Sequence, residues 1–124
     1  LNVAGAVVSQ VKNQLINDIC DYNHHFADID GNIVPVANAS VYWSDVTTEL
    51  LKRYPNAPFA AAYYYVDCNT VKWSLRSRKE ESINVAEISK KFGGGGHKDS
   101  GGFSSLPNEI SFIKKEDNVF KKAS

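Results

Sequence analysis

The amino-acid sequence predicts an α+β fold in which helices pack on a small mixed β-sheet. Segments with helical spacing of apolar residues alternate with short β-rich segments, and the β-rich segments come in pairs joined by turn residues. Length is a further observation, because 124 residues with 43% hydrophobic side chains can form one core and are close to the commonest domain size. We therefore expect a single domain, residues 1–124.

The first half of the chain is expected to contain a helix, a strand pair and a second helix. Residues 5–22 place apolar side chains near helical spacing, which predicts an amphipathic helix. Asp30 and Gly31 form a dipeptide typical of tight hairpin turns, so residues 26–39 are predicted to form two short strands. Ser44 is a suitable N-cap for a second helix, which we expect to stop near the next proline.

The second half is expected to begin with another strand pair. Residues 58–67 are rich in aromatic side chains and end at turn residues, and residues 71–77 follow as an antiparallel partner. Asn84 with Glu87 three places later has the form of a capping box, which predicts the start of a short helix ending at Phe92. The glycine run that follows would terminate this helix, and either another helix or a strand would continue to residue 103.

The segment KKFGGGGHKDSGGF, residues 90–103, is the most unusual part of the sequence. Glycine loses more backbone freedom on folding than other residues, so four in a row suggest that something approaches the main chain closely. The N–H groups of Gly93, Gly94, Gly95 and Gly96 could form an anion-binding nest, and a helix restarting after the run would add its dipole. His97 could donate a hydrogen bond to a phosphate oxygen or transfer a proton near neutral pH.

Charge restricts the ligands that the chain could bind. Lysine plus arginine equals aspartate plus glutamate, 14 of each, which argues against binding long nucleic acids through bulk positive charge. The positive charge nevertheless gathers in the second half, around the glycine run. Arg76 in SLRS could offer its planar guanidinium to phosphate oxygens, although composition alone favours an ordinary surface arginine at a strand end.

Cysteine usage and hydropathy indicate the compartment. Cys20 and Cys68 lack metal-ligand spacing and suggest no disulfide framework, so both are interpreted as reduced core residues. The sequence contains no apolar run of membrane-spanning length and opens with no signal segment, which predicts a cytoplasmic protein. It also contains no methionine, so we expect the chain to come from a longer protein.

Residues 73–103, WSLRSRKEESINVAEISKKFGGGGHKDSGGF, resemble the signature half of the DHH-associated C-terminal domain, type 1, of the DHH phosphoesterases. In that family a strand similar to SLRS is followed by a V-x-x-I-A helix and then by GGGGH and a later G-F pair. Residues 1–72 are compatible with the rest of that domain but carry no signature of their own. The resemblance implies the substrate-binding lobe of a two-lobed phosphoesterase of the oligoribonuclease and small-nucleotide phosphodiesterase type.

The resemblance also implies roles for particular residues. In the family the glycine run and its histidine face the substrate phosphate, and the arginine of the RS pair contacts the nucleotide. By position, the substrate-binding residues here would be Arg76, Ser77, Gly93, Gly94, Gly95, Gly96 and His97, with His97 touching the substrate phosphate during catalysis in the full enzyme. Asp99 departs from the pattern and adds a negative charge near this anion site.

The resemblance places the metal chemistry outside this chain. Members of the family hold a manganese pair on an N-terminal domain with an Asp-His-His motif, and no contiguous Asp-His-His occurs here. We therefore expect no metal or other cofactor in this chain, no hydrolysis by the chain alone, and pairing with a catalytic domain of the same parent protein.

Two functions remain open from the sequence. The first is binding of short oligonucleotides or small nucleotides as part of a phosphoesterase that hydrolyses phosphodiester or phosphate-ester bonds. The second is a free-standing nucleic-acid-binding or protein-interaction module without enzymatic activity. The sequence identifies neither the substrate within the first class nor whether the protein forms a homodimer, and it predicts no membrane partner.

Overall fold

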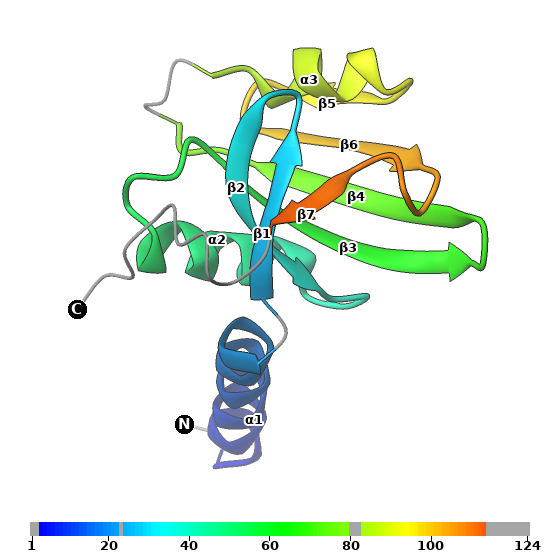
Figure 1. Cartoon of the computed structure of the whole chain (residues 1–124). Helices are drawn as coiled ribbons and strands as arrows, with labels where there is room; N and C mark the ends of the chain where they lie inside the picture. The colour runs from blue at the N-terminus through cyan, green and yellow to red at the C-terminus, as the bar shows by residue number, and fades with distance from the viewer. Residues whose placement is uncertain (1–2, 23, 80–82, 114–124) are drawn as a thin grey trace.

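The computed structural model of this chain describes residues 3–22, 24–79 and 83–113. Within these residues three helices pack on one seven-stranded mixed sheet (Figure 1), which confirms the predicted α+β class. In chain order the elements are α1 (Val3–Tyr22), β1 (His24–Ile29), β2 (Asn32–Asn38), α2 (Trp43–Arg53), β3 (Ala60–Asp67), β4 (Thr70–Arg76), α3 (Val85–Lys91), β5 (Gly95–His97), β6 (Ser100–Ser105) and β7 (Ser111–Ile113).

The strands are ordered β5-β6-β4-β3-β2-β1-β7 across the sheet. The pair β2–β3 is parallel, and α2 forms the crossover between these two strands. The other neighbouring pairs described are antiparallel, including the two predicted hairpins β1–β2 and β3–β4. The segment after the glycine run is a third hairpin, β5–β6, so it continues as strand rather than as helix.

Turns and caps follow the local sequence in two of three predicted cases. Asp30 and Gly31 both have positive φ, 55° and 81°, as expected for the tight turn of a two-residue hairpin. The Asn84 side chain accepts hydrogen bonds from two N–H groups of the first turn of α3, which confirms the predicted cap. Ser44 does not cap α2: the cap position is Tyr42, in a left-handed conformation with φ 53°, and Ser44 lies inside the first turn.

Each face of the sheet carries its own apolar cluster. On one face, α3 packs over strand residues, and the cluster includes Phe59, Trp73, Leu75, Val85 and Ile88. On the other face, α1 and α2 pack over β2 and β3, and the cluster includes Ile16, Ile19, Leu50, Ala60 and Ala62. Alternate residues of a strand point to opposite faces, which explains why neighbours such as Ala60 and Ala61 belong to different clusters.

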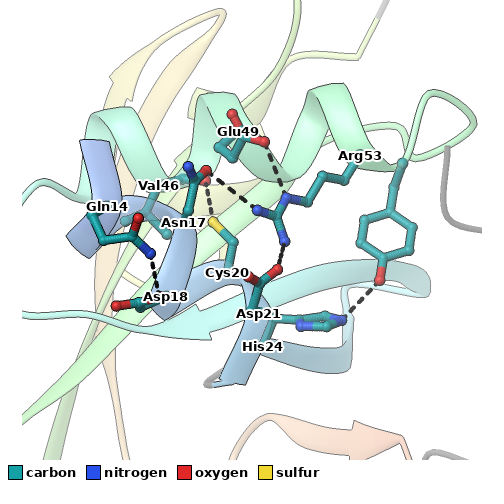
Figure 2. Close-up of polar contacts among 10 residues, drawn as sticks. Gln14, Asn17, Asp18, Cys20, Asp21, His24, Val46, Glu49 and Arg53 are labelled. Atoms are coloured by element: carbon teal, nitrogen blue, oxygen red, sulfur yellow. Dashed lines mark hydrogen bonds and ion pairs between the residues drawn. The ribbon is translucent and has the colours of Figure 1, made fainter. Parts of the chain in front are cut away.

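The helix α1 extends away from the sheet and is held to α2 near its C-terminal end (Figure 1). Arg53 of α2 is the main polar link, because its guanidinium bonds the Asp21 carboxylate and the Glu49 carboxylate, the latter at 3.0 Å (Figure 2). It also donates to the Asn17 side-chain oxygen at 3.4 Å. Arg53 therefore links residues of two helices through one largely buried side chain.

The two cysteines have different environments. Cys20 is fully buried between α1 and α2, as predicted, and its thiol donates to the Val46 carbonyl at 3.7 Å. Burial disfavours the charged thiolate and raises the pKa of Cys20 from 9.0 to about 11. Cys68 was expected in the core as well, but it is exposed, because it lies in the turn between β3 and β4.

Candidate nucleotide-binding face

The registers of three strands bring Arg76 and His97 onto one row of the sheet. Arg76, the last residue of β4, lies opposite Ser100 of β6, and Ser100 in turn lies opposite His97, the last residue of β5. Residues opposite one another point to the same face, and two strand spacings separate the outer members by about 10 Å. Two residues far apart in the sequence are thus presented together.

This row belongs to the face of the sheet that α2 covers only in part. Arg76 is also opposite Ala60, which is buried beneath α1 and α2. The strands beyond β3 on this face carry small or polar residues at partly or fully exposed positions: Lys72, Ser74, Arg76, Gly95, His97, Ser100, Gly102 and Ser104. We call this set the open face. The opposite face of the same strands is covered by α3.

The glycine run serves mainly to pass the chain from α3 into β5. Gly93 has φ 87°, and its N–H donates to the Lys90 carbonyl at 3.0 Å, so it ends the helix as predicted. The Gly94 N–H donates to the Ser89 carbonyl at 2.8 Å. These two N–H groups are already used at the end of α3, and binding of an anion by the run stays a prediction.

Close packing explains why Gly94 and Gly96 carry no side chain. A Cβ atom on Gly94 would lie 2.0 Å from the Gly102 carbonyl oxygen, and one on Gly96 would lie 2.5 Å from the Ser100 carbonyl oxygen. Gly96 also has φ 139°, which side chains rarely tolerate. Gly95 is different: a Cβ there would meet no atom within 4 Å, and its φ lies outside the left-handed region. Neither packing nor backbone conformation requires glycine at residue 95.

Arg76 is well placed to bind an anion. Its guanidinium donates to the Ser44 hydroxyl of α2 at 2.8 Å and forms no ion pair with any carboxylate among the described residues. A single neutral partner leaves most of its donors available to a ligand. His97 is exposed at the end of β5, an edge strand, and its side chain is accessible from the open face.

Ser77 follows Arg76 but does not share its exposure. Its N–H donates to the Asp99 carbonyl at 3.0 Å, which ties the end of β4 to the β5–β6 turn. Its hydroxyl is buried and has no hydrogen-bond partner among the described residues. Buried hydroxyls usually have hydrogen-bond partners, so the burial of this hydroxyl beside Arg76 has no explanation in the fold.

The sequence did not point to several residues that surround Arg76. Ser44 and Ser100 adjoin it only because α2 and β6 pack beside β4. Arg78 donates to three carbonyls at and beyond the C-terminal end of α2, those of Leu51, Tyr54 and Ala57, at 2.7–3.1 Å. It neutralises the negative end of that helix and holds α2 against β4.

The described residues contain no group of three or more histidine, cysteine, aspartate or glutamate side chains that could hold a metal ion. The donors available on the open face are cations, hydroxyls and main-chain groups, which suit anions rather than metals. None of the helices in the described part of the chain is long and apolar enough to cross a membrane.

Comparison with known proteins identifies relatives of the fold only. No family model and no curated protein matches the sequence. Among solved structures, an uncharacterized protein from Helicobacter pylori G27 matches with a TM-score of 0.50 and 18% identity, over 85% of this chain and 28% of its own. The pGpG-specific phosphodiesterase PggH from Vibrio cholerae matches with a TM-score of 0.53 and 13% identity, over 77% of this chain and 34% of its own. This chain therefore resembles a part, about a third, of each larger protein.

Proposed function

We propose that this chain is the substrate-binding domain of a DHH-family phosphoesterase that acts on short oligonucleotides or small nucleotides. The observation that carries the proposal is the row of Arg76, Ser100 and His97 on the open face. Two further findings support it: residues 73–103 resemble the signature of such domains, and the fold is similar to part of a pGpG-specific phosphodiesterase.

The row offers the chemical groups that recognise a phosphate. The Arg76 guanidinium supplies a planar fork of charged donors, and the His97 ring supplies a second donor about 10 Å along the row. Between and beside them the sheet surface is formed by Ser100 and Gly95, whose small size lets a ligand lie close to the main chain. A nucleotide would therefore lie across β4, β6 and β5, with a phosphate between the Arg76 guanidinium and the His97 ring.

Hydrolysis would require groups that these residues do not supply. A bound manganese pair would activate the attacking water, and we assign that pair to a separate catalytic domain because the open face lacks clustered carboxylates. The role of this chain is to hold the substrate and to direct the His97 donor at the reacting phosphate. This donor would stabilise the transition state more than the bound substrate, because negative charge on the phosphate oxygens increases there.

Nuclear magnetic resonance titration of the isotope-labelled chain with pGpG tests the proposal. We expect shifts centred on the amides of Gly95, His97 and Ser100, and a dissociation constant about tenfold weaker in Arg76→Ala, as one charge-assisted contact predicts. Lys91→Ala is the matched control: it removes one positive charge from α3, where Lys91 pairs with Asp30, and should leave affinity unchanged.

The same variants distinguish binding from folding. Arg76→Ala should retain the melting temperature within a few degrees, because it loses one exposed hydrogen bond to Ser44. A loss of thermal stability with unchanged affinity would assign Arg76 a structural role, and shifts confined to other surfaces would contradict the proposed face.

A further inference from the structure

The sheet carries a second row of residues on the same face as Arg76, nearer the turn between β3 and β4. Tyr64 of β3 lies opposite Lys72 of β4, and Lys72 lies opposite Ser104 of β6. Lys72 and Arg76 are four residues apart on one strand, so their side chains share a face. We call Tyr64, Lys72 and Ser104 the distal row. Four residues of extended strand place it about 13 Å from the row of Arg76.

The strand positions between the two rows carry small side chains. Ser74 of β4 lies opposite Ala62 of β3 and opposite Gly102 of β6, and both Ser74 and Gly102 are partly exposed. No bulky side chain of these strands therefore separates the two rows. An elongated ligand that lies along β4 can contact both.

The fold makes little use of the Tyr64 side chain. Tyr64 is half-buried, and among the described residues its hydroxyl has no hydrogen-bond partner and its ring pairs with no other aromatic ring. Tyr54 and Tyr63 differ, since each hydroxyl bonds a histidine nitrogen at 2.8 Å, and the Tyr63 ring also stacks on Trp73. Lys72 is exposed and forms no ion pair within the described part of the chain. An aromatic ring and a neighbouring cation are thus available to a ligand.

These two groups together suit a nucleobase better than a second phosphate. Tyrosine offers a flat ring on which the π face of a base can stack. A lysine beside that ring can donate to acceptor atoms at the edge of the base, such as O6 and N7 of guanine. A phosphate would use the lysine but gain nothing from the ring, whereas a base uses both.

We propose that the distal row binds a nucleobase, stacked on Tyr64 and contacted at its edge by Lys72, while a phosphate of the same ligand occupies the row of Arg76 and His97. This proposal rests on the proposed function, because the row of Arg76 fixes where the ligand begins. A dinucleotide is long enough to reach from one row to the other, and a mononucleotide occupies one row at a time. The distal row therefore adds affinity for a second nucleotide.

Titrations of the full chain with pGpG and with GMP, followed by nuclear magnetic resonance, test the distal row. We expect pGpG to bind about tenfold more tightly than GMP, as one stacked base predicts, and Tyr64→Ala to bring this ratio close to one. Tyr64→Phe keeps the ring and should preserve the ratio. Tyr65→Ala is the matched control and should also preserve it, because Tyr65 is the next residue of the same strand, points to the opposite face and is 52% exposed.

The signal of guanine H8 in pGpG reports the stacking directly. The ring current of a stacked tyrosine shifts base protons upfield, so we expect an upfield shift with the unmodified chain and with Tyr64→Phe, and none with Tyr64→Ala. Lys72→Ala should keep this shift while lowering the affinity for pGpG about threefold, as an exposed charged contact predicts. Absence of the shift in both the unmodified chain and Tyr64→Phe would overturn the stacking.

The remaining outcomes separate this proposal from the proposed function. An equal loss of affinity for both probes in Tyr64→Ala, with a lower melting temperature, would make Tyr64 structural and overturn the base contact. An unchanged ratio in a folded Tyr64→Ala chain would overturn it too, and weaker pGpG binding in Arg76→Ala would then leave the proposed function standing. Binding of neither probe would overturn both.

Discussion

At the scale of single residues, glycine is present at different positions of the glycine run for different physical reasons. The sequence indicated close approach to the main chain, and two separate reasons for glycine emerge from the structure. Gly93 ends α3 with a positive φ, and Gly94 and Gly96 make room for β6. Gly95 alone has no such requirement. The sequence could not separate these causes, because they depend on which strand lies beside each glycine.

This difference predicts opposite outcomes for two neighbouring alanine substitutions. Gly94→Ala should lower the melting temperature by roughly 5–15 °C, because its Cβ would lie 2.0 Å from the Gly102 carbonyl oxygen and the hairpin would have to shift. Gly95→Ala should keep or slightly raise the melting temperature, yet weaken pGpG binding about tenfold by placing a methyl group under the ligand. Thermal melts and titrations of both variants give the comparison.

Gly95→Ala is the sharper of the two variants because its folding is not in question. Unchanged pGpG affinity in this variant would show that no ligand touches the main chain at β5. A large loss of stability would instead contradict the open space around residue 95.

At the same scale, the candidate site was predictable where its residues lie in the signature, and not elsewhere. Arg76 and His97 are 21 positions apart, and their common row follows from hairpin registers that composition does not encode. Ser44 could not be predicted as a neighbour of Arg76, because the packing of α2 on the sheet determines this contact. The proposed role of the signature residues stays a prediction until binding is measured.

At the scale of elements, local signals determined most of the fold. The Asp30-Gly31 turn and the Asn84 cap were predictable because each depends on a few adjacent residues. The Ser44 cap was wrong because the cap residue is Tyr42, two residues earlier, and the Ser44 hydroxyl bonds Arg76 instead. The short strand β7 pairs with β1 from a distant part of the chain, so periodicity in three residues gave no signal.

The attachment of α1 gives an element-scale prediction. Arg53→Ala should release the C-terminal part of α1, because it removes the guanidinium that joins the Asp21 carboxylate of α1 to α2. We expect a cost of about 2 kcal/mol, less than for a fully buried pair because the Asp21 side chain is 41% exposed. Cys20 reports the change, since this residue of α1 is buried against α2 and has a pKa of about 11.

The readout is the alkylation rate of Cys20 at mildly alkaline pH in a Cys68→Ser background, which removes the exposed thiol. Release of α1 would expose the thiol and lower its pKa toward 9.0, so thiolate and access both increase and the rate should rise at least about tenfold. Lys52→Ala removes the neighbouring, exposed positive charge and should leave the rate unchanged. Continued protection of Cys20 in a folded Arg53→Ala chain would mean that apolar contacts alone hold α1.

At the scale of the whole molecule, recognition and chemistry are expected to belong to different domains. The chain corresponds to about a third of the solved structures that share its fold, and its described residues contain no clustered metal ligands. Its open face carries donors suited to phosphate, and we assign the activation of water to a separate domain. If the substrate lies between two domains, this chain supplies only about half of the contacts. Their binding free energy must still offset the lost translational freedom, so we expect weak affinity.

We therefore predict that the purified chain binds pGpG weakly and does not hydrolyse it when manganese is added. Chromatography should detect no GMP above the rate without protein, while a titration on the same sample shows the amide shifts at Gly95 and His97, so that inactivity is not confused with unfolding. Manganese-dependent release of GMP that disappears in His97→Ala would contradict the division of labour, because it would place water activation on the open face itself. Release that persists in His97→Ala would point to a contaminating enzyme, and purification to constant specific activity would identify it.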